Sequence, residues 1–168
     1  MKHLSEISHS RLLEILSYEP IVGIFRWREK TGPCSHVGAI AGSPQRGGHI
    51  QIGIDGEKYK AHRLAWFYVY GVWPPEDIDH INCIRGDNRL CNLRLASRAQ
   101  NLRNCGVRRN NTSGFKGVTF HRPTKKWRAR ILHNGVRHNL GLFDTPELAH
   151  AAYCAASERL HGEFARAA

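Results

Sequence analysis

The spacing of hydrophobic positions changes several times along the chain of 168 residues. The leucines of "EISHSRLLEILSYEP" recur at helical spacing, which predicts a short amphipathic helix that stops before Pro20. "GIFRW" is typical of a strand, and the Gly/Ser/Pro-rich "CSHVGAIAGSPQRGG" predicts a loop. Residues alternate on either side of Asp55-Gly56 in "HIQIGIDGEKYKAH", which predicts a hairpin closed by a type I′ turn.

The apolar run "RLAWFYVYG" predicts the main hydrophobic helix of this half, ended by "WPPE". The pattern starts again after the polar, basic stretch "NCGVRRNNTSG". Three strand-like runs, "GFKGVTFHR", "KWRARILHN" and "VRHNLGLF", are separated by turns at Pro123-Thr124 and Asn134-Gly135. An Ala-rich helix follows, with Thr145 as its N-cap, Pro146 at the first helical position and Gly162 just past its end.

The formal net charge is +11 and the pI about 9.9, which favours a polyanionic partner over a neutral one. The positive charge is concentrated in residues 106–168, which contain eleven basic and four acidic residues. No segment is long and apolar enough to span a membrane, and the N-terminus has no signal-peptide core. We therefore expect a cytoplasmic protein with no membrane partner. The five cysteines predict reduced thiols, and the absence of a CxxC pair predicts no structural zinc.

The stretch "DIDHINCIRGDNRLCNLRLASRAQN" carries the candidate chemistry. Phosphodiester cleavage needs a base for water and a cation beside the phosphate. His80 is a suitable base near neutral pH, and Asp79 is a hard oxygen ligand for Mg²⁺. Neighbours on a strand point to opposite sides, so this pair shares one site only where the strand twists or ends. Asn101, on the helix predicted to follow, offers a further oxygen, and Asn92 is placed to pin the intervening loop.

These spacings resemble the HNH nuclease motif, in the branch found in phage and mobile-element homing endonucleases. The resemblance implies a ββα-metal fold in which His80 is the general base and Asp79 and Asn101 are metal ligands. Asn92 would orient the base or hold the loop. Oxygen-only ligation implies one Mg²⁺ or Mn²⁺ ion per site rather than zinc. The alternative is that His80 and the Asn residues only cap turns.

Several residues around the motif are open to two interpretations. Arg94 and Arg98 are candidate phosphate clamps, with solvated surface charge as the alternative. His62, in "AHRLAW", is interpreted as a buried histidine whose hydrogen bonds are satisfied, rather than as part of the site.

The C-terminal segment predicts a three-stranded sheet packed on one helix. Alternation places Trp127, Ala129 and Ile131 on one side of their strand, with Arg128 and Arg130 on the other. In the next strand Val136, His138, Leu140 and Leu142 oppose Arg137 and Asn139. Arg and Asn are the side chains that read guanine and adenine edges, so the face with Arg128, Arg130, Arg137 and Asn139 is a candidate DNA-binding face.

Residues 112–165 resemble the Apetala-2/ethylene-response-factor DNA-binding domain, through "KGV", "KWRARI" and "LGLFDTPELAHAAYCAA". The resemblance implies a sheet that binds in the major groove of DNA. Thr119, His121 and Asn139 stand where plant members have other residues, so the base specificity should differ. These three join the candidate DNA contacts, together with Lys116 and Lys126.

The sequence therefore predicts an α+β protein: an N-terminal helix, a hairpin and an HNH domain in residues 1–105, with the motif in 60–105. Residues 106–111 form the predicted linker and 112–168 the DNA-binding domain. The predicted function is metal-dependent cleavage of double-stranded DNA by a monomer or weak homodimer, in the bacterial host cytoplasm if a phage encodes it. Two alternatives are a sequence-specific regulator with a vestigial nuclease half, and an RNA-binding or RNA-cutting protein. The sheet's lack of predicted exposed aromatic side chains counts against RNA.

Overall fold

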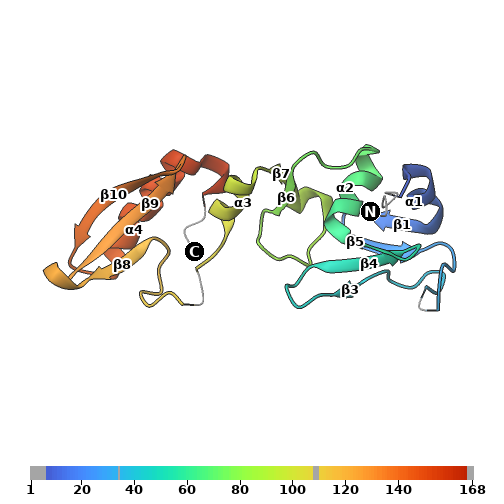
Figure 1. Ribbon diagram of the computed structural model, residues 1–168, viewed down its shortest axis with the longest axis horizontal. Coiled ribbons are helices and arrows are strands. Elements are labelled where there is room, and N and C mark those ends of the chain that lie inside the picture. Colours follow the sequence, from blue (N-terminus) through green and yellow to red (C-terminus); the bar gives the residue numbers. More distant parts are fainter. Residues whose placement is uncertain (1–6, 34, 108–109, 166–168) are drawn as a thin grey trace, which may run out of the picture. The chain divides into compact units, whose positions relative to one another are not determined.

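The computed structural model describes residues 7–33, 35–107 and 110–165 (Figure 1), and the chain divides into two compact units, Met1–Ala96 and Ser97–Ala168. The division falls before helix α3 (Arg98–Asn104), so that helix groups with the C-terminal half. The predicted linker, residues 106–111, includes 108 and 109, which lie outside the described residues.

The first unit begins with α1 (His9–Ile15), whose N-cap Ser8 accepts a hydrogen bond from the Arg11 backbone through its Oγ. The predicted helix is too long, because the chain leaves α1 at Ile15 and continues as strand β1 (Leu16–Glu19). β1 pairs antiparallel with β2 (Ile24–Trp27). This pairing buries Leu16 and Tyr18 against the partner strand, and tertiary packing therefore overrides the local helical pattern.

A three-stranded antiparallel sheet follows, with β4 (Ile50–Ile54) between β3 (Ser43–Pro44) and β5 (Glu57–Lys60). Asp55 and Gly56 both have positive φ, 50° and 85°, as a type I′ turn requires, which confirms the predicted hairpin. The short strand β3 lies inside the segment predicted to be a loop. Helix α2 (Ala61–Tyr70) confirms the predicted apolar helix and ends at Gly71 in the left-handed conformation.

The last elements of this unit are β6 (Asp77–His80) and β7 (Leu93–Ala96), an antiparallel pair joined by residues 81–92. The 3-10 helix η1 (Leu90–Asn92) closes this loop. One apolar core unites α1, the β1–β2 pair, α2 and the β4 strand, with Leu12, Phe25, Ile52, Leu64 and Ile78 among its buried side chains. The core fixes α2 and β6 against β4, which is what positions the histidines described below.

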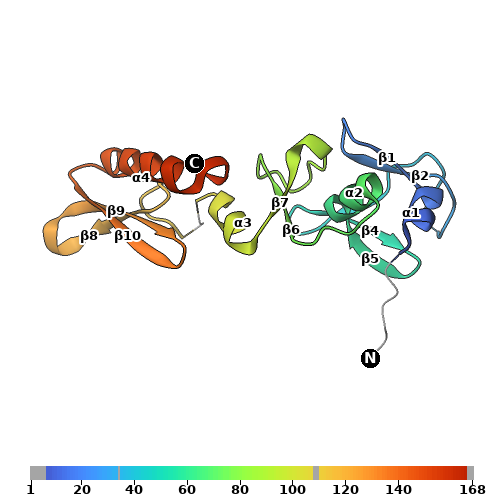
Figure 2. The ribbon, with the colours of Figure 1, turned by 90° about the horizontal axis from the view of Figure 1, so that it is seen from above.

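The second unit contains α3 and an antiparallel sheet in the order β10-β9-β8. Its strands are β8 (Val118–His121), β9 (Lys126–His133) and β10 (Val136–Phe143), and Figure 2 shows α4 (Pro146–His161) along one face of the sheet. The short 3-10 helices η2 (Arg122–Thr124) and η3 (Gly162–Phe164) follow β8 and α4. Thr145 caps α4, its Oγ1 accepting a hydrogen bond from the Leu148 backbone, as the sequence predicts.

The predicted faces of this sheet hold except beyond a bulge in β10. Ala129 and Ile131 are buried against α4, as expected. The register shifts between Asn139 and Gly141, so the alternation reverses after the bulge. Leu142 pairs with Arg128 and is 40% exposed, so the prediction that it packs toward the helix was wrong.

None of the described helices combines the length and the apolarity needed to cross a bilayer. The four described cysteines are free thiols: Cys83, Cys91, Cys105 and Cys154.

Candidate active site

His80 ends strand β6 and lies at the centre of the site. Its side chain is buried, with the residue 5% exposed, and the backbone turns immediately afterwards, where its carbonyl accepts a hydrogen bond from Cys83 N at 2.8 Å. The strand therefore ends at the residue that the sequence marks as the base. Asn88 Oδ1, from the following loop, lies 3.4 Å from His80 Nε2.

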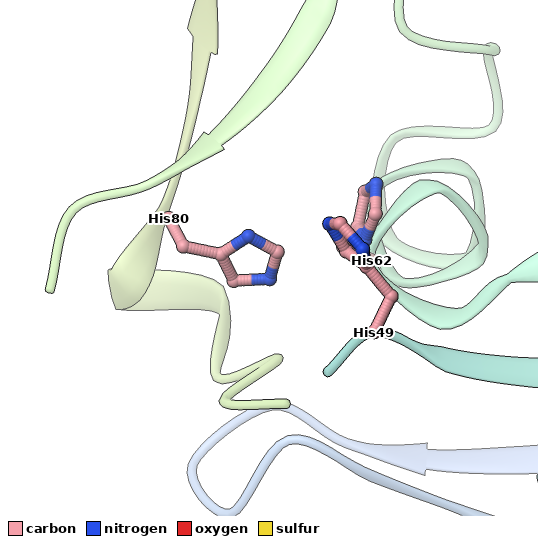
Figure 3. A group of neighbouring side chains, drawn as sticks. All are labelled: His49, His62 and His80. Carbon is pink, nitrogen blue, oxygen red and sulfur yellow. The ribbon is translucent and has the colours of Figure 1, made fainter. Parts of the chain in front are cut away.

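Two more histidines approach His80 from other elements (Figure 3). His49 immediately precedes β4, and His62 is the second residue of α2. The ring centroids lie 5.0 Å apart for His62 and His80, 5.1 Å for His49 and His62, and 5.8 Å for His49 and His80. One ring nitrogen of each lies within 4.8 Å of the others. We call His49, His62 and His80 the histidine cluster.

The expectation that His62 is buried and satisfied is half wrong. It is 4% exposed, but its Nδ1 is buried and has no hydrogen-bond partner among the described residues. An unpartnered buried nitrogen costs free energy, so it calls for a role beyond packing.

The histidine cluster is held in the neutral state. Burial lowers the pKa of His62 to about 3, and positive charge on neighbouring side chains adds to the effect. Burial lowers the pKa of His49 to about 4, with Arg85 the first of the cations that contribute. Burial also lowers the pKa of His80, against the opposing effects of Asn88 and nearby carboxylates. At neutral pH the cluster therefore offers nitrogen lone pairs that can accept a proton or bind a metal ion.

Asn92 holds the loop of residues 81–92 through both ends of its amide. Its Oδ1 accepts a hydrogen bond from Asn82 N at 3.0 Å. Its Nδ2 donates to Asn82 Oδ1 at 3.0 Å and to the Asp87 carbonyl at 2.8 Å. This is the loop-holding geometry that the sequence predicts for Asn92, while a part in catalysis stays a prediction.

The β1–β2 hairpin supports the same loop from outside. The buried Tyr18 hydroxyl donates to the Asn88 carbonyl at 2.7 Å, and Leu90 N donates to the Pro20 carbonyl at 3.0 Å. Gly23, in the turn of the hairpin, packs directly on the loop backbone. The hairpin thus fixes Asn88, the residue whose side chain approaches His80.

Asp79 points away from the histidine cluster. Strand alternation places it on the opposite face of β6 from His80, opposite Arg94 in the register of β7. Arg94 Nε and Nη2 contact Asp79 Oδ2 at 2.9 and 2.8 Å, and the two side chains are 15% and 5% exposed. In this structure the Arg94 guanidinium is largely buried against Asp79, and its contact with phosphate stays a prediction.

The other predicted ligand, Asn101, belongs to α3 in the second unit and is not among the side chains that the first unit brings together. Ser97 and Gln100 form a capping box that fixes the start of α3. Arg98, the first residue of α3, is exposed. Metal ligation by Asp79 and Asn101 stays a prediction from the family resemblance.

In the second unit, cross-strand register defines an outer face on the side of the sheet away from α4. Thr119 pairs with Arg128, His121 with Lys126, and Arg130 with Asn139. Arg137 joins them through its pairing with Leu132. We call this set the outer face: Thr119, His121, Lys126, Arg128, Arg130, Arg137 and Asn139.

Electrostatic and hydrogen-bonding features set the outer face apart from ordinary surface charge. Arg128 Nε is buried with no hydrogen-bond partner among the described residues. Burial, together with the charges of Arg128 and Arg137, lowers the pKa of Arg130. Lys116 Nζ donates to the Arg103 and Cys105 carbonyls at 2.5 and 2.7 Å, so it holds the end of α3, and its contact with DNA stays a prediction.

His49 and Asn88 were missed by sequence reasoning. His49 lies outside the motif and meets His80 only because the β4–β5 hairpin and α2 fold back on β6. No spacing rule connects them. Asn88 lies within "DNR", where the residue type was visible, but the sequence offered no sign that this amide faces the imidazole.

Residues 59–103 match the family model of the HNH endonuclease. The chain is 37% identical over 112 residues to "Protein 3.8" of Escherichia phage T7, an alignment covering 64% of this chain and 92% of that protein. It is 32% identical over 116 residues to "Uncharacterized HNH endonuclease L560" of Acanthamoeba polyphaga mimivirus, covering 68% of this chain and 59% of that protein. No solved structure matches the chain significantly.

The buried histidine at the end of β6, its asparagine-held loop and the family match together define an HNH endonuclease domain. Residues 59–103 thus belong to the HNH endonuclease family, and the chain has similar proteins in a phage and in another virus. The resemblance of residues 112–165 to the Apetala-2 domain stays a prediction, because the family match covers only 59–103.

Proposed function

We propose that the protein is a DNA endonuclease in which His80 is the general base. The observation that carries this proposal is a buried, neutral imidazole at the end of β6, within the segment that matches the HNH family. His80 takes a proton from water, the water oxygen attacks phosphorus, and the 3′ oxygen departs. A proton on His80 Nε2 would be held by Asn88 Oδ1, which leaves Nδ1 as the acceptor.

A divalent cation is the expected cofactor. The chemistry of the donor set fits a hard ion: Asp79 offers carboxylate oxygens and Asn101 an amide oxygen, the ligands that Mg²⁺ and Mn²⁺ prefer. When bound, the cation would neutralise charge on the phosphate and on the departing oxygen. Asp79→Ala and Asn101→Ala should each raise the Mg²⁺ concentration needed for cleavage.

Supercoiled plasmid tests the nuclease directly. The wild-type protein with Mg²⁺ should convert supercoiled DNA to open circles, and EDTA should stop it. His80→Ala should lose at least 100-fold in rate, as expected for removal of a general base. His36→Ala, which changes an exposed histidine of the same unit, is the matched control and should cut normally. Equal rates for His80→Ala and the wild type would overturn the proposal.

We propose further that the outer face of the second unit binds the DNA duplex. The support is a set of Arg and Asn side chains on the face away from α4, including a buried guanidinium nitrogen without a partner among the described residues. Arg130→Ala should weaken duplex binding by roughly 1–3 kcal/mol if Arg130 reads a base. Arg159→Ala, on α4 and exposed, should leave binding unchanged. Equal effects of the two substitutions would refute this face.

One catalytic site cuts one strand, so a monomer should nick, and a double-strand break would take two copies or two events. The homing type is part of the proposal, supported by the two viral relatives. Mapping cleavage on DNA that flanks the gene tests it, because a homing nuclease acts near its own insertion site.

The basic outer face also favours a second candidate, a regulator that binds DNA without cutting. A protein that shifts a duplex in a gel but never nicks plasmid at any Mg²⁺ concentration would support that candidate. Competition between duplex DNA and single-stranded RNA tests the RNA alternative. Phe120 is 47% exposed, contrary to the expected lack of exposed aromatic side chains, but it pairs with Trp127 on the side away from the arginines.

A further inference from the structure

We propose that the histidine cluster is a binding site for a borderline transition-metal ion such as Zn²⁺, and that the bound ion switches off cleavage by occupying His80. The site would be separate from the oxygen-ligand site expected for Mg²⁺. The switching half of this inference rests on the proposed role of His80 as the base.

The geometry of the cluster is close to that of a metal site. Three Zn–N bonds of about 2.0–2.1 Å at tetrahedral angles put the ligand nitrogens roughly 3.4 Å apart. In the structure one nitrogen from each of the three rings already lies within 4.8 Å of the other two. Side-chain rotations would have to close the remaining gap. The core holds α2, β6 and β4, which carry His62 and His80 and directly follow His49.

The chemistry selects the class of ion. Three imidazole nitrogens without a carboxylate suit Zn²⁺, Co²⁺, Ni²⁺ or Cu²⁺, whereas Mg²⁺ prefers oxygen ligands. Three protein ligands leave a fourth position for water or for a phosphate oxygen. His49 is half-buried and is the most exposed of the three, since His62 and His80 are 4% and 5% exposed. An ion from solvent would therefore reach His49 first.

Two features of the surroundings support binding and one opposes it. His62 Nδ1 has no hydrogen-bond partner among the described residues, so metal binding by this ring would displace no partner of that atom, and Asn88 Oδ1 would hold the orientation of the His80 ring. The nearby Arg85 and Lys60 charges disfavour any cation. We therefore expect an affinity below that of structural zinc sites, suited to reversible occupation.

An occupied cluster would prevent proton transfer. The lone pair of His80 that accepts the proton of water would be donated to the ion instead, so no base would remain at the end of β6. Zinc should consequently inhibit Mg²⁺-dependent nicking without competing with Mg²⁺ for the same ligands.

The test uses the full-length protein, with Zn²⁺ as the probe. Zinc binding is measured by competition with a chromophoric chelator, and nicking is measured at saturating Mg²⁺ with increasing Zn²⁺. His49→Ala is the informative variant, because it removes one ring of the cluster and leaves the proposed base, His80, in place. We expect the wild type to bind one zinc ion per chain. His49→Ala should bind zinc with an affinity at least tenfold lower. This variant should need at least tenfold more zinc than the wild type to halve its own zinc-free nicking rate. His36→Ala should behave as the wild type in both assays.

Zinc held by cysteine thiols or by Asp79 would bind and inhibit His49→Ala and the wild type equally, and that result would overturn the inference. So would a wild-type chain that binds no zinc. If the wild type does not nick at all, the proposed function and the switch both fail. The chelator competition then still decides whether the histidine cluster is a metal site.

Discussion

Gly23→Ala tests how the β1–β2 hairpin holds the loop beside His80. Gly23 has a φ of +75°, and a Cβ placed there would lie 2.3 Å from Arg89 N and 2.5 Å from Asn88 C. Both contacts are with backbone atoms, so no side-chain rotation can relieve them. The loop of residues 81–92 must move away from the hairpin to accommodate a single methyl group.

The magnitude follows from two separable costs. A residue with a Cβ at positive φ costs about 1–2 kcal/mol. Moving the loop also weakens two hydrogen bonds, each contributing about 0.5–1.5 kcal/mol: Tyr18 hydroxyl to Asn88 O and Leu90 N to Pro20 O. Gly23→Ala should therefore lower the free energy of unfolding by about 2–5 kcal/mol. Gly38 has a φ of +82°, and a methyl group at that position would meet no atom within 4 Å, so Gly38→Ala should show the first cost alone.

Urea denaturation and plasmid nicking measure the two consequences. Because Asn88 approaches His80, a displaced loop should also disturb the base, and misplacement by about 1 Å costs on the order of 100-fold in rate. We expect Gly23→Ala to nick at least tenfold more slowly than Gly38→Ala. Equal stability and equal rates for the two variants would refute the idea that the hairpin positions the loop.

The remaining predictions concern three other contacts. Asp79→Asn and Arg94→Met should each destabilise the protein by about 3–5 kcal/mol, because each removes one charge of a largely buried ion pair. A double-mutant cycle by urea denaturation should give a coupling energy of about 0.5–3 kcal/mol, and strict additivity would contradict the pair. Tyr18→Phe leaves the buried Asn88 carbonyl without its donor and should cost about 1–3 kcal/mol, a loss that unchanged urea midpoints would exclude. Burial lowers the pKa of His161 in the folded state. Its contribution to stability is therefore complete above the unfolded pKa near 6.5 and is lost as pH falls toward the folded pKa. The free energy of unfolding should fall by at most about 1.4 kcal/mol per pH unit in this range. The protection factors of α4 amides, taken relative to the intrinsic exchange rate at each pH, should fall over that range in the wild type but not in His161→Asn.

Local patterns in the sequence predicted most of the elements. Asp55-Gly56 and Asn134-Gly135 define their turns because both residues of each pair have positive φ. The alternation of β9 was readable because α4 covers one side only. The end of α1 could not be predicted from the local pattern, because Leu16 joins a strand whose partner comes later in the chain. The reversal at Leu142 depends on a bulge that no alternating pattern contains.

The site was predictable only in part. His80 and Asn92 stand out because the motif keeps them close in sequence and their loop is local. The opposite orientations of Asp79 and His80 follow from strand alternation, but the pairing of Asp79 with Arg94 depends on the register of β6 and β7. The approach of His49 depends on packing between distant segments, which a one-dimensional pattern does not encode.

Chemical rescue tests the central claim most directly. His80→Gly removes the imidazole and leaves a space at the end of β6, so this variant should nick plasmid at least 100-fold more slowly than the wild type. Added imidazole should then restore part of the rate in the His80→Gly protein while leaving His36→Ala unaffected. A His80→Gly protein that nicks at the wild-type rate without imidazole would contradict the assignment of His80 as the base.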